Sequence, residues 1–138
     1  MSDVSRRAFL SRTFGALAAA LPLPRLRFPA GGSGPGHPTP RPGITAARVL
    51  TREELADTPG VIPVFDQVRE IPGIVDGIRC NCGCADLPGF YSLLSCYEGD
   101  AMARSCPVCQ GQGRMTYRLH KEGKTLDEIR EAIDARYG

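Results

Sequence analysis

The chain has 138 residues, with 17 Lys and Arg against 15 Asp and Glu, so its formal net charge is only +2. The charge is unevenly distributed, because residues 1–43 contain six arginines and one acid, which leaves 11 basic and 14 acidic side chains in residues 44–138. A mildly acidic domain of this kind lacks the basic surface that nucleic acids and anionic membranes require. We therefore expect no nucleic-acid partner.

The N-terminus has the pattern of an export signal. Ser5-Arg6-Arg7-Ala8-Phe9-Leu10 matches the S-R-R-x-F-L signal of the twin-arginine route, and an apolar run follows from Phe14 to Leu23. The run has about half of the roughly 20 residues that cross a bilayer, which favours a cleaved signal over a membrane anchor. We assign residues 1–30 to this signal. It predicts export to the periplasm or the outer face of the cytoplasmic membrane, with membrane contact only through the signal.

A linker follows at residues 31–43. Seven of the 12 prolines lie between Pro22 and Gly43, together with several glycines. A segment with so few apolar side chains buries too little surface to offset the entropy of ordering it. We expect a disordered tether here, with His37 inside it.

Residues 44–138 are expected to form one domain in which helix signals dominate. Thr51 and Glu54 have the spacing of a capping box that opens a short helix, and Pro63 and Pro72 are suited to the first turns of two more. Residues 92–98 are a further short candidate. No segment alternates long enough to predict a strand.

The strongest helix signals come last. A helix from Pro107 to Glu122 would place Val108, Met115 and Leu119 on one face and end at Gly123. A capping box at Thr125 then opens a helix whose apolar side chains are Leu126, Ile129, Ile133 and Tyr137. The predicted fold class is therefore mainly α: a small helical domain with a cysteine-rich loop between its halves, preceded by the signal and the tether.

All six cysteines lie within thirty residues, at positions Cys80, Cys82, Cys84, Cys96, Cys106 and Cys109. Alternating cysteines suit disulfides poorly, because a bridge needs Cβ atoms about 3.8 Å apart in a restricted torsion. With Gly83 allowing the backbone to turn, the first three thiolates can instead converge on a soft ion, completed by Cys96 or the Cys106/Cys109 pair. We predict that all six are metal ligands.

The identity of the ion stays open between copper(I) and zinc. Zinc suits a closed site of four thiolates, and copper(I) suits a dense cluster poor in histidine. An iron–sulfur cluster is disfavoured, because the spacings of cluster ferredoxins are absent. A bound ion would also help a small domain without tryptophan to fold.

The spacing of the six cysteines resembles that of the bacterial PCYCGC-motif family, over residues 71–138. In that family a C-x-C-x-C cluster is followed by a single cysteine, a C-x-x-C pair and an ending like Gly123-Lys124-Thr125 to Arg136-Tyr137-Gly138. The resemblance implies that each of the six cysteines is a candidate ligand. This chain has Arg79 and Asn81 at the Pro and Tyr of the motif, and Phe90-Tyr91 where members carry a histidine, which favours an all-sulfur site. The resemblance implies no particular biochemical activity.

Two partial resemblances concern the Cys106-Pro107-Val108-Cys109-Gln110-Gly111-Gln112 segment. With the C-terminal Gly123–Gly138 segment it is similar to the three-helix thiol oxidoreductase of cytochrome c maturation, although the gap between the two segments is shorter here by about a helix. Cys106 would then start a helix, where the dipole lowers a thiol pKa. Cys106-x-x-Cys109-x-Gly111-x-Gly113 is also similar to one copy of the zinc knuckle of co-chaperones.

Three functions are therefore open. The preferred one is an exported metal-binding protein that acts as a store, carrier or metal-assembly factor, with an envelope metalloprotein or a redox protein as partner. The second is thiol–disulfide exchange by Cys106 and Cys109, and the third is a structural scaffold of three disulfides. Binding is favoured over catalysis, because the sequence contains no Walker loop, no dinucleotide fingerprint and no identifiable base for a serine nucleophile.

Overall fold

The computed structural model describes residues 36–138. The predicted export signal and residues 31–35 of the predicted linker lie outside this range. The described chain is mainly helical, which confirms the predicted fold class, and its only β pairing is an isolated bridge between Val49 and Glu98. The four α-helices are α1 (Ile62–Glu70), α2 (Pro72–Val75), α3 (Pro107–Lys121) and α4 (Leu126–Tyr137). Four 3-10 turns accompany them: η1 (Pro59–Val61), η2 (Cys84–Asp86), η3 (Leu93–Tyr97) and η4 (Met102–Arg104).

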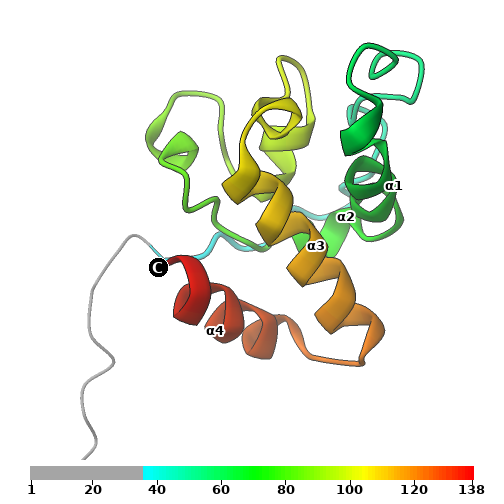
Figure 1. Cartoon of the computed structure of the whole chain (residues 1–138). Helices are drawn as coiled ribbons and strands as arrows, with labels where there is room; N and C mark the ends of the chain where they lie inside the picture. The colour runs from blue at the N-terminus through cyan, green and yellow to red at the C-terminus, as the bar shows by residue number, and fades with distance from the viewer. Residues whose placement is uncertain (1–35) are drawn as a thin grey trace, which may run out of the picture. The chain divides into compact units, whose positions relative to one another are not determined.

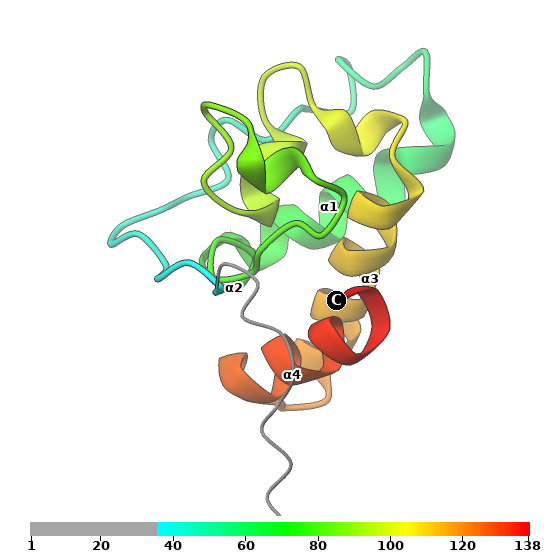
Figure 2. The ribbon, with the colours of Figure 1, turned by 90° about the vertical axis from the view of Figure 1, so that its left-hand side faces the viewer.

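Helix α3 is the centre of the fold. It packs against α1 on one side and α4 on the other, and η3 and η4 also contact it. Figure 1 shows α3 running diagonally between these two helices, and the view turned by 90° in Figure 2 keeps α4 beside its C-terminal half. The segment between α2 and α3, which holds five of the six cysteines, is gathered near the N-terminal end of α3 (Figure 1).

Local chemistry explains where the helices start and end. A proline lies in the first turn of α1, α2 and α3, where its missing N–H costs no intrahelical hydrogen bond. At the start of α4 the Thr125 side chain accepts from the Glu128 amide at 3.3 Å, and Glu128 accepts from the Thr125 amide at 2.8 Å. Gly123 takes a φ of +84°, the left-handed conformation typical of a residue just beyond a helix end.

The helix predicted at Thr51 does not form. The hydrogen bonds of the capping box are present, from the Thr51 amide to Glu54 at 2.7 Å and from the Glu54 amide to the Thr51 hydroxyl at 3.3 Å. Residues 52–57 nevertheless form turns, and the chain becomes α-helical only at Ile62. A capping box satisfies the first amides of a helix, but a helix also needs a run long enough to offset its nucleation cost. The prediction for residues 92–98 is confirmed as the 3-10 turn η3.

The buried face of α3 differs from the predicted one. Met115 and Leu119 are only half-buried, as is Val108. The fully buried positions are Cys109, Gln112, Gly113 and Thr116, which have the i, i+3, i+4, i+7 spacing of one helix face. Three of these four residues are polar or glycine, so a search for apolar periodicity selects the wrong side of the helix.

Residues 36–43 pack against the domain, although the sequence places them in the linker. Arg41 forms an ion pair with the fully buried Asp76, at 2.7 Å from its guanidinium, and its own amide donates to the same carboxylate at 2.8 Å. His37, expected in the tether, accepts from the Arg79 amide at 2.9 Å and contacts Asp134 at 3.1 Å. The described part of the linker is thus ordered by polar contacts, which apolar content does not reveal.

The core lies between α1, α3 and the 3-10 turns. Phe65 and Tyr97 are fully buried and meet edge to face, with ring centroids 4.8 Å apart. Ile129 and Ile133 fix α4 to this core. Among residues 36–138, no helix is both long and apolar enough to cross a membrane.

Candidate metal centre

Three separate elements bring the cysteines together. Cys80 follows the buried Ile78, and the left-handed Gly83, with φ +92°, turns the chain so that Cys84 starts η2. Cys96 lies within η3, and the last pair lies at the start of α3, with Cys106 as its N-cap and Cys109 in its first turn. The turn predicted at Gly83 is therefore present.

The structure places all six sulfur atoms in one cluster. The Sγ atoms of Cys80, Cys84, Cys96 and Cys109 lie within 4.8 Å of one another, and all four residues are buried. A second group within the same limit contains Cys82, Cys106 and again Cys109, and the first two of these are half-buried. Each group has a size that suits one metal ion, and no histidine or carboxylate belongs to either group.

The sulfurs are in close contact but not bonded. Cys82 Sγ lies 2.7 Å from Cys84 Sγ and 3.2 Å from Cys80 Sγ, whereas a disulfide bond is about 2.05 Å long. Cys109 Sγ lies 3.3 Å from Cys80 Sγ and 3.4 Å from Cys82 Sγ. All six are free thiols in the structure. The cluster is thus an array of soft donor atoms whose protons an incoming cation can replace.

The proximity of the thiols shifts their pKa values in opposite directions. Hydrogen bonds from the Cys109 and Cys96 thiols lower the pKa of Cys80 to about 3. Burial, with hydrogen bonds to Cys84 and Cys80, raises the pKa of Cys82 to about 12. Burial also opposes ionisation of Cys106, but hydrogen bonds from the Cys109 and Val108 amides and from the Cys109 and Cys82 thiols outweigh it and lower the pKa of this thiol. The metal-free cluster therefore mixes thiolates and thiols.

Gln112 holds the cysteine loop against α3, and the sequence analysis missed it. Its side chain is fully buried, accepts from the Asn81 amide at 3.0 Å and donates to the Arg79 carbonyl at 3.0 Å. These two residues flank Cys80. Because Gln112 lies about one helical turn after Cys109, its side-chain amide holds Cys80 against α3 close to Cys109. Because Gln112 lies 31 residues from Asn81, no local pattern indicates this pairing.

Two glycines of the Cys106–Gly113 motif allow tyrosines to approach α3. A Cβ atom at Gly113 would collide with the Tyr97 hydroxyl, and one at Gly111 would collide with the Tyr137 hydroxyl. Tyr97 donates its hydroxyl to the Cys109 carbonyl at 2.8 Å. Both glycines lie within α3, so here they serve close helix packing and not the turn of a zinc knuckle.

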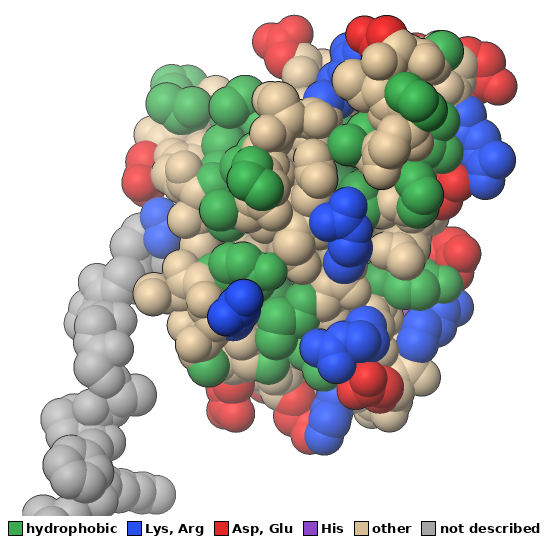
Figure 3. All heavy atoms as spheres, viewed as in Figure 1, with side chains coloured by type: hydrophobic (Ala, Val, Ile, Leu, Met, Phe, Trp, Pro, Cys, Tyr) green, Lys and Arg blue, Asp and Glu red, His purple; other side chains and the backbone are tan. Residues whose placement is uncertain are grey.

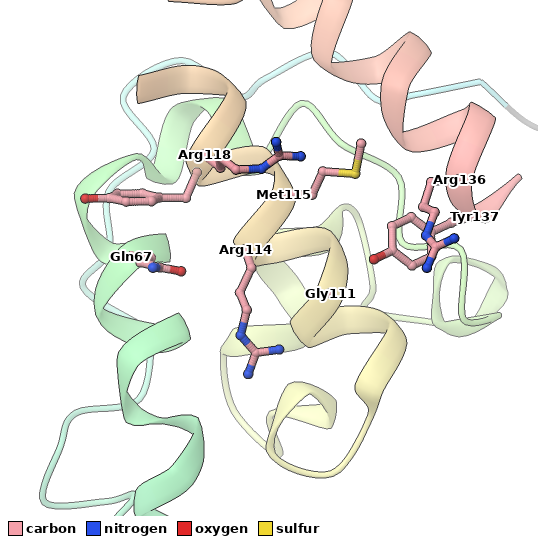
Figure 4. A pocket seen from close by; sticks show the side chains of 8 residues that line it. Gln67, Gly111, Arg114, Met115, Arg118, Arg136 and Tyr137 are labelled. Atoms are coloured by element: carbon pink, nitrogen blue, oxygen red, sulfur yellow. The ribbon is translucent and has the colours of Figure 1, made fainter. Parts of the chain in front are cut away.

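A separate groove lies where α1, α3 and α4 meet (Figure 4). Its volume is about 560 Å³, and its lining includes Arg114, Arg118 and Arg136 but no acidic residue. Figure 3 shows Lys and Arg side chains in the middle and lower part of this face, with most Asp and Glu side chains toward its rim. The groove contains no cysteine, histidine, serine or carboxylate. It offers positive charge, aromatic surface and the thioether of Met115, but no thiol, imidazole or carboxylate.

Comparisons with known proteins add no assignment. The chain matches no family model, no curated protein and no solved structure. The structure itself defines the class of site: a compact cluster of six cysteines in a small helical domain, with an arrangement that can hold a metal ion.

Proposed function

We propose that this protein is an exported metal-binding protein whose cysteine cluster holds copper(I) or zinc. The observation that carries the proposal is the set of four buried Sγ atoms, from Cys80, Cys84, Cys96 and Cys109, within 4.8 Å of one another. Zinc–thiolate bonds of about 2.3 Å place the sulfurs of a tetrahedral site about 3.8 Å apart. The cluster needs only small movements to reach that geometry.

The sulfur donor atoms of the cluster favour soft metal ions. Both groups consist of cysteine alone, and thiolates select copper(I) and zinc over hard cations such as magnesium or calcium. A purely structural disulfide scaffold is the weaker interpretation, because the C-x-C spacing strains any bridge among Cys80, Cys82 and Cys84, and all six cysteines are free thiols here.

The role that fits best is that of a store, carrier or assembly factor for the ion. The four buried ligands would retain an ion, and the half-buried Cys82 and Cys106 give it a route to a partner. The twin-arginine signal supports this role, because that route exports folded proteins and would keep an ion loaded in the cytosol. An envelope metalloprotein is the expected recipient. On the spacing of its cysteines, we further propose that the chain belongs with the PCYCGC-motif proteins.

The test combines bound metal with free thiols on exported protein purified without added metal. Elemental analysis should find at least one copper or zinc per chain, and thiol titration in denaturant should find at least four reduced cysteines. Cys80→Ser should lose the ion, whereas Ser105→Ala, at an exposed position beside Cys106, should retain it. Absence of metal, both as purified and after anaerobic loading with either ion, would refute the proposal.

Thiol–disulfide exchange is the second candidate, and one observation favours it. Cys106 is the N-cap of α3, and its thiol pKa is lowered by the backbone amides of that turn, as in exchange proteins that use a C-x-x-C pair. Under this function Cys106→Ser should abolish exchange with a small disulfide while the fold persists, and Cys109→Ser should trap mixed disulfides on Cys106. Ser105→Ala, at an exposed position, should then leave the exchange rate unchanged.

A further inference from the structure

We propose that the cluster holds two ions, joined by the sulfur of Cys109, and that the ion nearer the surface is the one exchanged with partners. The inference rests on the proposed metal-binding function and adds to it the number, the connection and the different roles of the ions. Its basis is that Cys109 belongs to both cysteine groups, the buried one with Cys80, Cys84 and Cys96 and the half-buried one with Cys82 and Cys106.

The position of Cys109 suits a bridging ligand. Its Sγ lies 3.3 Å from Cys80 Sγ, in the buried group, and 3.4 Å from Cys82 Sγ, in the half-buried group. A thiolate has more than one lone pair and can therefore bind two soft ions at once. With bonds of about 2.3 Å to each ion, two zinc ions that share this sulfur lie at most about 4.6 Å apart.

Cys109 is also held firmly in place. It lies in the first turn of a 15-residue helix and is fully buried. Its carbonyl accepts the Tyr97 hydroxyl, and the side chain of Gln112 fixes the backbone on either side of Cys80 at the same helix. The atom common to both groups is thus fixed by burial and by its place in α3, which keeps the two positions in a constant relation.

The two positions differ in coordination and in access. The buried position has four thiolates, which complete a tetrahedral site and leave no place for a further ligand. The outer position has three thiolates, and two of them come from half-buried residues. A site with three protein ligands keeps one coordination position open, as in catalytic zinc sites.

These differences assign a role to each ion. The buried ion links the loop of Cys80 and Cys84, turn η3 and helix α3, so it stabilises the fold. The outer ion can accept a fourth ligand from a partner, and further donors of the same partner site can then replace Cys82, Cys106 and Cys109 in turn, so that the ion passes to the partner. The partner site is expected to be a soft donor, such as a thiolate or thioether, because the exchanged ion is soft. No electron transfer is involved, and the protons lost on loading return to the released thiols.

The experiment uses cadmium-113 as the probe, because it binds thiolates as zinc does and reports each site by NMR. The full chain is reduced, loaded anaerobically with cadmium-113, and its bound ions are counted by native mass spectrometry. We expect two ions and two resonances split by mutual coupling through the shared sulfur. Cys106→Ser should retain one ion and show one unsplit resonance, and Ser105→Ala should behave as the wild type.

Each alternative result points to a different failure. One ion in both the wild type and Cys106→Ser would overturn the two-ion inference and leave the proposed function intact. Two resonances without splitting would overturn the bridging role of Cys109, and loss of both ions in Cys106→Ser would overturn the division into two positions. Binding of no ion to a wild-type protein that remains folded would overturn the proposed function itself.

Discussion

The Gln112 side chain is expected to couple the stability of the domain to its affinity for metal. Gln112→Ala removes the acceptor of the Asn81 amide and the donor to the Arg79 carbonyl, both at 3.0 Å. A buried polar group left without a partner costs about 1–3 kcal/mol, and water can reach these two half-buried residues in part. We therefore expect the free energy of unfolding of the metal-free protein to fall by about 2–4 kcal/mol.

The same substitution should weaken metal binding. Residues that orient the ligands of a metal typically contribute 10-fold to 100-fold to its affinity, and Gln112 orients the backbone on either side of Cys80. Urea unfolding of the reduced, metal-free chain gives the stability, and competition with a chromogenic chelator gives the affinity for zinc. A loss of about tenfold or more in affinity is the expected result.

Two further variants make the test specific. Gln112→Glu keeps an acceptor for the Asn81 amide but places a carboxylate beside thiolates. Its free energy of unfolding should therefore approach that of the wild type as the pH falls and the buried carboxyl is protonated. Thr116→Val alters the same buried face one turn along, where the hydroxyl has no hydrogen-bond partner, and should leave stability unchanged or increase it by about 1 kcal/mol. If Gln112→Ala stays within about 0.5 kcal/mol of the wild type with unchanged affinity, the reasoning is refuted.

Three other predictions concern packing, pH and metal release. Gly113→Ala should lower the unfolding free energy by about 1–3 kcal/mol in thermal or urea unfolding, because its Cβ collides with the Tyr97 hydroxyl; Gly60→Ala, with open space around it, should not. Burial acts to raise the pKa of Asp76, but hydrogen bonds from Arg41 and Ser92 outweigh it and lower this pKa, so the contribution of Asp76 to stability is fully present above about pH 4 and declines as the pH falls below it toward the lowered pKa. Asp76→Asn should accordingly be less stable than the wild type at pH 7, with a smaller deficit at pH 3, and an equal deficit at both would contradict this assignment. Acid should also release metal, because protons compete for the thiolates, and a chelator at pH 7 should remove one ion much faster than the other; a single rate of release would count against the outer, open position.

Several features of the fold could be predicted because their causes are local. The starts of α1, α3 and α4 follow from Pro63, Pro107 and the Thr125 capping box, whose effects act within four residues along the chain. The clustering of the cysteines was predicted from their spacing, since three thiols in five residues must lie near each other. The glycine at position 83, with φ +92°, provides the turn that this spacing needs.

Other features depend on partners that are distant in the sequence. The tether was predicted from composition, yet His37 and Arg41 bind Arg79 and Asp76, about 40 residues away. The buried face of α3 was assigned to apolar residues, although Gln112 is buried because the backbone at residues 79 and 81 supplies its hydrogen bonds. A buried polar side chain is stable only with such partners, and only tertiary structure brings them into reach.

The amino-acid sequence by itself determined the helical class of the domain, most of its helix starts and the six sulfur ligands offered to a metal. Tertiary structure alone decided how those ligands are divided: four are buried, two are half-buried, and Cys109 is common to both groups. The physical reason is that spacing along a chain limits which atoms can meet but does not set how deeply each is buried. Burial depends on the packing of η3 and α3 around the cysteine loop, and in the two-ion arrangement that we propose it separates the ion to be retained from the ion to be passed on.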